Sequence, residues 1–359
     1  MTGYFEPLTV GKIGLPNRLV MGPMTRSRTP AGVVTELTAR YYTQRAGAGL
    51  IISEATGISE IAQGYADSPG LYTDEQVRAW RTVTDAVHAA GGRMFAQLVH
   101  CGRIGHPSLY ADGGLPVAPS AIGSGEQMFT PEGMVDRPVP RALTLDEIAS
   151  TVGDFVTAAR NAVDAGFDGV ELHAANGFLL HQFLADGTNQ RTDAYGGTIA
   201  NRIRFVVEVV GAVSDAIGPE RVGLRVSPGI TFNGMAGAES DTAELYPALA
   251  QALSAVPLAY LHVNELITRD TTRLIRAAWN GPLLLCAHPT AESFPSTPAI
   301  GRPALEEGLA DALVLAELWL ANPDLVERVR TDGPYNTADR ATFYGGDQRG
   351  YTDYPTLAD

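Results

Sequence analysis

The chain has 359 residues, of which 45% are hydrophobic, so it is long enough to bury a sizeable core. Its 26 Lys and Arg residues against 40 Asp and Glu residues give a net charge of −14, which argues against nucleic acid or an anionic membrane as the main partner. The two cysteines, Cys101 and Cys286, form no Cys-x-x-Cys pair and indicate neither a disulfide framework nor a zinc site. Apolar runs are too short for a membrane span and a signal sequence is not recognisable, so we expect a cytoplasmic protein.

The first predicted elements are strands. Residues 8–17 read as a short hairpin with its turn at Gly11 and Lys12, of the kind that covers the bottom of a barrel. Short and nearly continuously apolar runs then recur along the chain, as expected for parallel strands that are covered on both faces. These runs span residues 18–23, 49–54, 93–98, 168–172, 221–226, 259–263, 282–287 and 311–316.

Helical patterns, with apolar residues three and four positions apart, lie between several of these runs. They span residues 35–46, 74–90, 144–165, 200–217 and 243–255. Asp74 and Thr144 are the expected N-caps, and Glu147 completes a capping box with Thr144. Eight strands that alternate with helices predict an α/β fold, the (β/α)8 TIM barrel. Since no composition break divides the chain, we predict one domain over residues 1–359, with a long insertion after the third strand (99–141).

Polar side chains gather where the predicted strands end. The stretch from Ala165 to Phe205 is the richest, because a strand is followed there by a loop with two histidines and two asparagines. In a TIM barrel the carboxyl ends of the strands meet on one face, so their terminal residues should surround a common cavity. Together they offer hydrogen-bonding groups suited to a flat heterocycle or a carbonyl. These strand-end residues are Pro23, Met24, Thr25, Glu54, Ala55, Thr56, Gln97, His100, His173, Asn176 and Arg225.

With these residues, the sequence resembles the old yellow enzyme family of FMN-dependent ene reductases over essentially its whole length. The matching stretches are Gly166–Leu184, Asn189–Asn201, Gln97 with His100-x-Gly102-Arg103, His106-Pro107, Val117–Ile122 and the tail Phe343–Pro355. The resemblance implies FMN lying flat over the strand ends, NAD(P)H as the reductant, and hydride transfer to the β-carbon of an α,β-unsaturated carbonyl. It implies a small-molecule substrate with a conjugated carbonyl and leaves open whether the protein is a monomer or a homo-oligomer.

The same resemblance assigns catalytic roles to four residues. His173 and Asn176 match the pair that donates hydrogen bonds to the substrate carbonyl oxygen, where negative charge accumulates as hydride arrives. Tyr344 matches a tail tyrosine that covers the substrate, and Tyr65 matches a loop tyrosine at the mouth of the cavity. Most lone histidines at strand ends are structural, but the matching context of His173 favours a catalytic role.

The resemblance also assigns the flavin contacts. Thr25 resembles the hydroxyl that bonds the flavin O4, Gln97 the amide that pairs with the pyrimidine edge, and Arg225 the cation beside N1 and O2. An alternative for Arg225 is a structural ion pair with a barrel carboxylate such as Glu171 or Glu54. The full set of expected cofactor-binding residues is Pro23, Met24, Thr25, Ala55, Gln97, Arg225, Ala287 and His288.

Three positions depart from the family pattern. Phe178 stands where the family usually has a tyrosine that protonates the substrate α-carbon, and a phenyl ring cannot donate a proton. Ala287 and His288 replace a Gly-Gly pair whose backbone approaches the FMN phosphate, and Pro289 after them has no N–H. Glu317 replaces the arginine that grips this phosphate, so an acid stands where a positive partner is expected.

These departures leave two functions open. In the first, the protein is an FMN enzyme that reduces activated alkenes and holds the phosphate by altered contacts, with a charged His288 or Arg302 as the compensating cation. In the second, the barrel has lost FMN and uses the cavity for redox-neutral isomerisation, cyclisation or conjugate addition on an enone or polyketide-like substrate. Both functions use His173 and Asn176 to polarise a carbonyl.

Three prolines, at 295, 298 and 303, also predict that the seventh barrel helix is broken.

Overall fold

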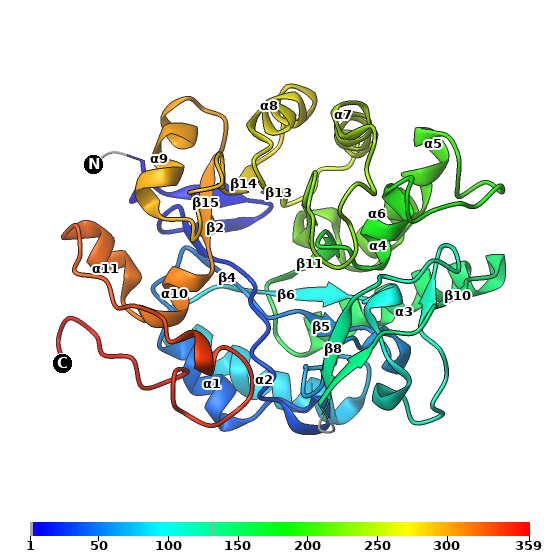
Figure 1. The fold of residues 1–359 in the computed structure, drawn as a ribbon. Helices are drawn as coiled ribbons and strands as arrows, with labels where there is room; N and C mark the ends of the chain where they lie inside the picture. The colour runs from blue at the N-terminus through cyan, green and yellow to red at the C-terminus, as the bar shows by residue number, and fades with distance from the viewer. Residues whose placement is uncertain (1–2, 131–132) are drawn as a thin grey trace.

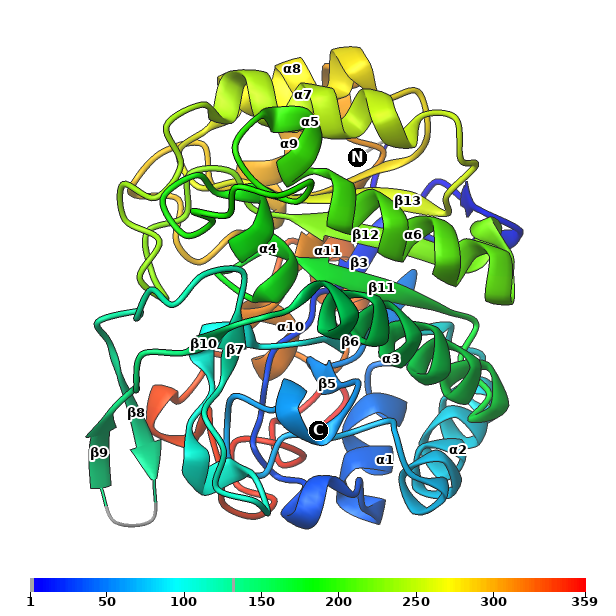
Figure 2. The same ribbon diagram turned by 90° about the vertical axis from the view of Figure 1, so that its right-hand side faces the viewer.

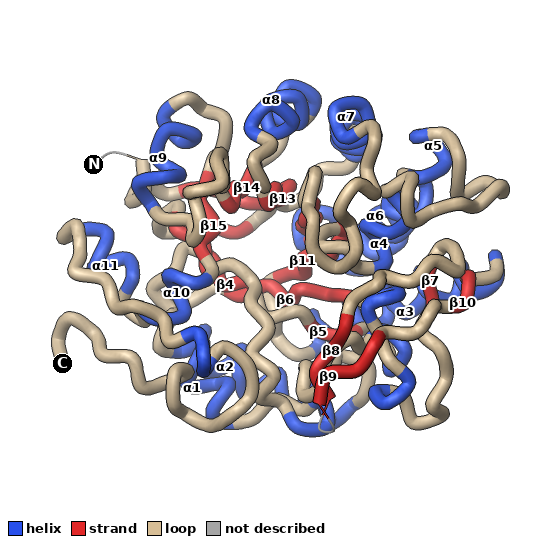
Figure 3. The backbone as a smooth tube through the Cα atoms, viewed as in Figure 1, coloured by secondary structure: helices blue, strands red, loops and turns tan. Residues whose placement is uncertain are grey.

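The computed structural model describes residues 3–130 and 133–359, and its centre is a closed barrel of parallel strands (Figures 1 and 3). The barrel strands are β3 (Leu19–Met21), β4 (Leu50–Ile52), β6 (Met94–Val99), β11 (Gly169–Ala174), β12 (Val222–Val226), β13 (Tyr260–Asn264), β14 (Leu283–Cys286) and β15 (Ala312–Leu315). Neighbours in this order pair in parallel, and the pairing of β15 with β3 closes the ring. Every barrel residue except Asn264 is buried, as strands covered on both faces require. The predicted TIM barrel is confirmed.

Helices surround this barrel on its outer side (Figure 2). They are α1 (Glu36–Thr43), α2 (Asp74–Ala89), α3 (Leu145–Asp164), α4 (Leu179–Leu184), α5 (Ile199–Arg202), α6 (Arg204–Ile217), α7 (Thr242–Leu253), α8 (Arg269–Ala278), α9 (Pro298–Glu306), α10 (Glu317–Ala321) and α11 (Leu325–Arg330). The predicted helix over 200–217 is divided at Ile203 into α5 and α6. None of the helices in the described part of the chain is both long and apolar enough to cross a bilayer.

Two helices differ from the sequence-based prediction, one in its N-cap and the other in its continuity. Helix α2 is capped by Thr73, whose side chain accepts the backbone N–H of Gln76, so Asp74 is the first helical residue rather than the cap. Helix α9 is continuous where a break was predicted. Thr297 caps it and Pro298 occupies its first turn, where a missing N–H has no helical partner to lose.

The N-terminal hairpin closes one end of the barrel. Strands β1 (Leu8–Val10) and β2 (Ile13–Leu15) pair antiparallel, with Val10 opposite Ile13 across the predicted turn. Val10 and Leu15 are buried in one apolar cluster with residues from barrel strands, so the hairpin seals the barrel interior from below. The predicted hairpin lid is therefore present.

The insertion after β6 carries four short strands beside the barrel. Strands β7 (Val117–Ala118) and β10 (Arg141–Ala142) pair in parallel, and β8 (Gln127–Thr130) and β9 (Gly133–Asp136) form an antiparallel hairpin. This β8–β9 hairpin projects from the body of the barrel (Figure 2). A short extension of the sheet, β5 (Thr56–Gly57), pairs with the end of β6. The long insertion predicted after the third barrel strand is thus a structured flap at the barrel edge.

The C-terminal tail is fixed against helix α1 (Figure 1). The buried guanidinium of Arg26 donates to the carbonyl oxygen of Gly350 at 2.8 Å, and Tyr351 stacks on Tyr41 with ring centroids 4.1 Å apart. These contacts hold the tail beside the loop after β3, and the backbone N–H of Gly345, next to Tyr344, donates to the Arg26 carbonyl oxygen at 2.9 Å. A residue far from the barrel in sequence is thereby placed beside the strand ends.

A buried carboxyl just beyond β4 should make stability depend on pH. Burial raises the pKa of Glu54 to about 7, even though its Oε2 accepts the backbone N–H of Arg26. The folded state therefore binds a proton that the unfolded state releases near pH 4.3. We expect the free energy of unfolding to fall by about 3 kcal/mol from this group as pH rises from about 4.3 to about 7. In denaturant titrations, Glu54→Gln should lack this part of the slope, and identical slopes in both proteins would contradict the assignment.

Candidate active site

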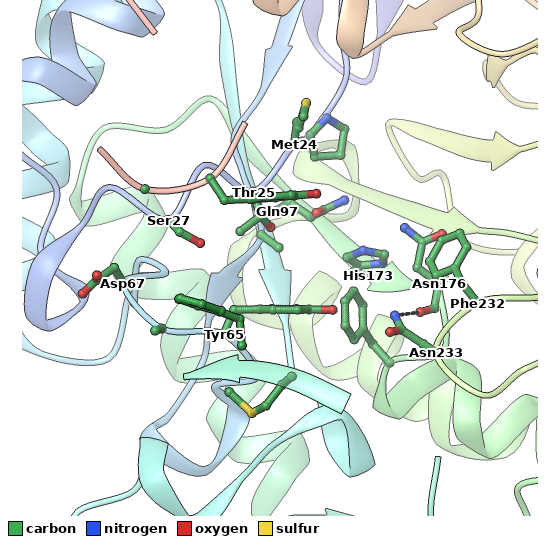
Figure 4. A pocket seen from close by; sticks show the side chains of 18 of the residues that line it. Met24, Thr25, Ser27, Tyr65, Asp67, Gln97, His173, Asn176, Phe232 and Asn233 are labelled. Atoms are coloured by element: carbon green, nitrogen blue, oxygen red, sulfur yellow. Dashed lines mark hydrogen bonds between the residues drawn. The ribbon is translucent and has the colours of Figure 1, made fainter. Parts of the chain in front are cut away.

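A cavity of about 660 Å³ lies at the carboxyl ends of the barrel strands (Figure 4). Its walls come from the loop after β3, the ends of β6, β11 and β12, the β8–β9 hairpin and the tail. It brings together ten of the residues singled out from the sequence: Pro23, Met24, Thr25, Ala55, Tyr65, Gln97, His173, Asn176, Arg225 and Tyr344. Ala287 and His288 do not line it. The roles assigned to these residues remain predictions.

Strand register places the two most distinctive side chains together. Strands β11 and β12 pair in parallel with His173 directly opposite Arg225. Side chains at paired positions of neighbouring strands point to the same face of a sheet, so both enter the cavity. The prediction that His173 and Arg225 meet required only that both residues stand at the ends of strands.

Asn176 is held by three asparagine and serine contacts. Its backbone has φ 58°, in the left-handed region that asparagine tolerates, and its N–H donates to Ser227 Oγ at 2.7 Å. Its carbonyl oxygen accepts from Asn233 Nδ2 at 2.7 Å, the dashed contact in Figure 4. Its side-chain Oδ1 accepts from Asn264 Nδ2 at 3.3 Å. Because Asn264 engages the amide oxygen, the amide nitrogen of Asn176 is left to donate to a ligand in the cavity.

His173 is buried in the wall of the cavity with an edge-to-face contact to Phe178, ring centroids 4.8 Å apart. Burial, reinforced by the nearby charge of Arg225, holds the pKa of His173 well below its ordinary value, so the ring is neutral at neutral pH. Its Nδ1 has no hydrogen-bond partner among the described residues. A neutral imidazole carries one N–H, which makes His173 a hydrogen-bond donor rather than a charged group.

A buried hydrogen-bond network around Glu171 bears on whether Arg225 forms an ion pair. Both oxygens of the Glu171 carboxylate are engaged, one by Gln97 Nε2 at 2.7 Å and the other by His262 Nδ1 at 2.8 Å. Arg225 forms no ion pair within residues 3–130 and 133–359, and its Nε is buried without a partner there. The alternative of an ion pair to Glu171 or Glu54 is therefore not what the structure has. Arg225 keeps a free donor, and the Gln97 oxygen is left as an acceptor.

Phe178 and Tyr65 belong to the apolar part of the wall, with ring centroids 6.3 Å apart at an interplanar angle of 86°. Burial raises the pKa of the Tyr65 phenol well above its ordinary range, so this hydroxyl stays protonated. Further lining residues were missed from the sequence because they lie on loops or on the short insertion strand β8, where no barrel-strand end marks them. These are Ser27, Ala66, Asp67, Gln127, Met128, Phe129, Arg137, Phe232, Asn233 and Gly345.

His288, the second residue of the Ala287-His288 pair, contacts Glu265 and Phe294 within the protein. The backbone N–H of His288 donates to the carboxylate of Glu265 at 3.2 Å, and its Nδ1 bonds the Glu265 carbonyl oxygen at 3.0 Å. The ring stacks on Phe294 with centroids 4.0 Å apart. Burial holds the pKa of His288 below its ordinary value, so a compensating positive charge at neutral pH is not expected.

The other candidate cation is also engaged elsewhere. Arg302 donates from Nε to the Tyr4 hydroxyl at 3.1 Å, and its guanidinium lies 5.6 Å from the centre of that ring. Glu317, at the start of α10, is partly exposed and lies 3.5 Å from the guanidinium of Arg340. The acid at this position has therefore acquired a basic partner from the tail.

A TIM barrel with a cavity at the carboxyl ends of its strands is the architecture of TIM-barrel enzymes. A sequence model of the NADH:flavin oxidoreductase / NADH oxidase family matches residues 4–336. The chain is 39% identical to 12-oxophytodienoate reductase 2 of Arabidopsis thaliana, covering 98% of this chain and 95% of that protein. It is 41% identical to 12-oxophytodienoate reductase 1 of Oryza sativa subsp. japonica, covering 98% and 92%.

Solved structures give the same result. Morphinone reductase matches with a TM-score of 0.93 at 43% identity, covering 99% of this chain and 97% of that one. The old yellow enzyme homologue from Zymomonas mobilis matches with a TM-score of 0.92 at 40% identity, covering 99% and 100%. The chain belongs to the NADH:flavin oxidoreductase / NADH oxidase family, the family of old yellow enzyme.

This family uses FMN with NAD(P)H as the reductant, and the two ends of the site differ in how well they fit that cofactor. The ring end fits, because Thr25, Gln97 and Arg225 line the cavity and Arg225 Nε is a buried donor without a partner among the described residues. The phosphate end does not show the expected donors, because the N–H of His288 is bound to Glu265 and position 317 is an acid. The residues at the ring end thus suit a flavin, whereas the residues at the phosphate end differ from those expected.

Proposed function

We propose that this protein is an ene reductase that reduces the C=C bond of α,β-unsaturated carbonyl compounds with NAD(P)H. The observation that carries the proposal is the meeting of His173, Asn176 and Arg225 in one cavity, with donor groups that no protein acceptor engages within the described ranges. FMN, when bound and reduced, supplies the hydride for the β-carbon. The names of the relatives, reductases of 12-oxophytodienoate and of morphinone, support the same reaction class.

His173 and Asn176 act on the carbonyl oxygen. The neutral imidazole donates one hydrogen bond, and the amide of Asn176, oriented by Asn264, donates a second. Negative charge develops on this oxygen as the β-carbon is reduced, so donors that are already in place stabilise the transition state more than the ground state. His173 is buried and Asn176 is partly buried, which limits the competition of water for these hydrogen bonds.

Two tyrosines complete the proposed catalytic set. Tyr65 is partly buried and presents a protonated phenol next to Phe178, which itself has no proton to donate. Tyr344, two-thirds exposed, stands on the tail at the cavity mouth and covers the substrate.

Purified protein can test the reductase function directly. We expect a flavin absorption spectrum that NADPH bleaches and 2-cyclohexenone restores, with consumption of NADPH.

A second candidate, redox-neutral work on an enone without FMN, is favoured by one observation, the altered phosphate end around His288 and Glu317. The same cavity would then use His173 and Asn176 for isomerisation, cyclisation or conjugate addition. The two functions separate in one experiment. A protein that stays colourless after incubation with FMN, and that converts an enone without NADPH, would exclude the reductase, whereas saturable flavin reduction by NADPH would exclude the second function.

A further inference from the structure

A second arginine in the cavity, Arg137, comes from the insertion rather than from the barrel. It directly follows β9, and its side chain is only 4% exposed although it lines the cavity. One guanidinium nitrogen, Nη1, donates to the carbonyl oxygen of Gln127 at 3.0 Å. The Nε atom is buried and has no hydrogen-bond partner in the part of the chain that the structure describes. The segment that follows β9 thus places in the cavity wall a guanidinium whose hydrogen-bonding capacity is only partly used by the described residues.

Within the described residues, the charge of Arg137 is only partly neutralised. The nearest carboxylate among them, that of Glu126, lies 3.7 Å from Nη1, beyond hydrogen-bond distance, and is itself 38% exposed. Its other oxygen accepts the backbone N–H of Gly234 at 2.8 Å. Asp67 also lines the cavity but forms no ion pair with Arg137 among the described residues. A buried guanidinium with a free N–H is costly unless a ligand completes its hydrogen bonds.

The surroundings of Arg137 show what kind of ligand this is. Aromatic rings connect the polar carbonyl-binding wall with Arg137, because Phe178 packs on His173 with ring centroids 4.8 Å apart and on Tyr65 with centroids 6.3 Å apart. The guanidinium carbon lies 5.8 Å from the centre of the Tyr65 ring. A ligand that satisfies all these groups has a carbonyl at one end, an apolar body and an oxyanion at the other. Arginine is well suited to the oxyanion, because its planar fork matches the geometry of a carboxylate.

We propose that Arg137 binds an oxyanion of the substrate, so that the preferred substrates are conjugated carbonyl compounds carrying a carboxylate. This inference rests on the proposed reductase function, since it names the substrate class of the same cavity. It also makes the insertion a determinant of specificity, distinct from the barrel residues that polarise the carbonyl.

The test compares cyclohexenones that carry a carboxylate on alkyl chains of increasing length with the methyl ester of each. In Arg137→Gln, KM and the dissociation constant from calorimetry should rise about 10- to 100-fold for the best acid and hardly change for its ester. Arg137→Lys, which keeps the charge but loses the fork, should fall between the two. Arg141→Gln is the matched control, because Arg141 is exposed and pairs with Glu147 at 2.7 Å outside the cavity lining.

Each outcome decides the proposal. Equal losses for acid and ester would overturn it, because Arg137 would then only shape the cavity. A loss confined to reduction of the flavin by NADPH would also overturn it and assign the guanidinium to the phosphates of the dinucleotide. The calorimetric comparison needs no turnover, and the turnover of 2-cyclohexenone does not involve a carboxylate. Failure of the reductase function and failure of the Arg137 assignment are therefore seen separately.

Discussion

Alanine in place of His173 or Asn176 is expected to lower the kcat for an α,β-unsaturated ketone by ~10²-fold or more. Each substitution removes one of the two donors that stabilise charge on the carbonyl oxygen. Ser227 and Asn233 bond the backbone of Asn176 and are kept in Asn176→Ala, so the effect should come from the lost side-chain donor rather than from a collapsed loop. Steady-state kinetics with 2-cyclohexenone and NADPH measures the effect, and thermal unfolding checks that the variants are folded.

His106→Ala provides a control, because this histidine lies on the insertion and does not line the cavity. Its kcat should match that of the unmodified protein. Near-normal kcat in both His173→Ala and Asn176→Ala would show that the carbonyl binds elsewhere. The expectation holds for the reductase and for redox-neutral chemistry alike, so it tests the site independently of the cofactor.

Glu317→Arg is expected to tighten FMN binding by ~10²-fold. The family carries an arginine here, and at ~5 Å and an effective dielectric constant of ~20 a reversal of charge beside an anion changes the Coulomb energy by several kcal/mol. Arg340, now 3.5 Å from the carboxylate of Glu317, would be released and would add to the positive potential. Fluorescence quenching on titration with FMN measures the affinity.

Riboflavin separates the phosphate from the ring, because it lacks the phosphate and should use only the proposed ring contacts of Thr25, Gln97 and Arg225. Its affinity should hardly change in Glu317→Arg. Glu327→Arg is the matched charge reversal, since Glu327 also lies 3.5 Å from an arginine but on the exposed face of α11. Equal gains for riboflavin and FMN would mean that Glu317 acts through folding or the ring pocket. Tight binding of FMN by the unmodified protein would point to a phosphate clamp formed by other residues.

Much of the fold and of the ring end of the site could be predicted from the sequence because both follow from local pattern. Strands buried on both faces are continuously apolar, so the barrel strands appear as short runs, and the carboxyl ends of those runs mark the cavity. Gln97, His173 and Arg225 stand at such ends, which is why their meeting could be expected without coordinates. Membership of the family rests on the same stretches.

The orientation, the charge state and the hydrogen-bond partners of the site residues depend on the tertiary structure alone. The amide of Asn176 is oriented by Asn264, 88 residues away in the chain, and no local pattern records such a partner. The uncharged state of His288 depends on burial against Phe294 and on Glu265. Arg137 does not follow a barrel strand, and only the folded insertion places it in the cavity wall. Periodicity and strand ends are local properties of the sequence, whereas burial and hydrogen-bond partners depend on residues that only folding brings together.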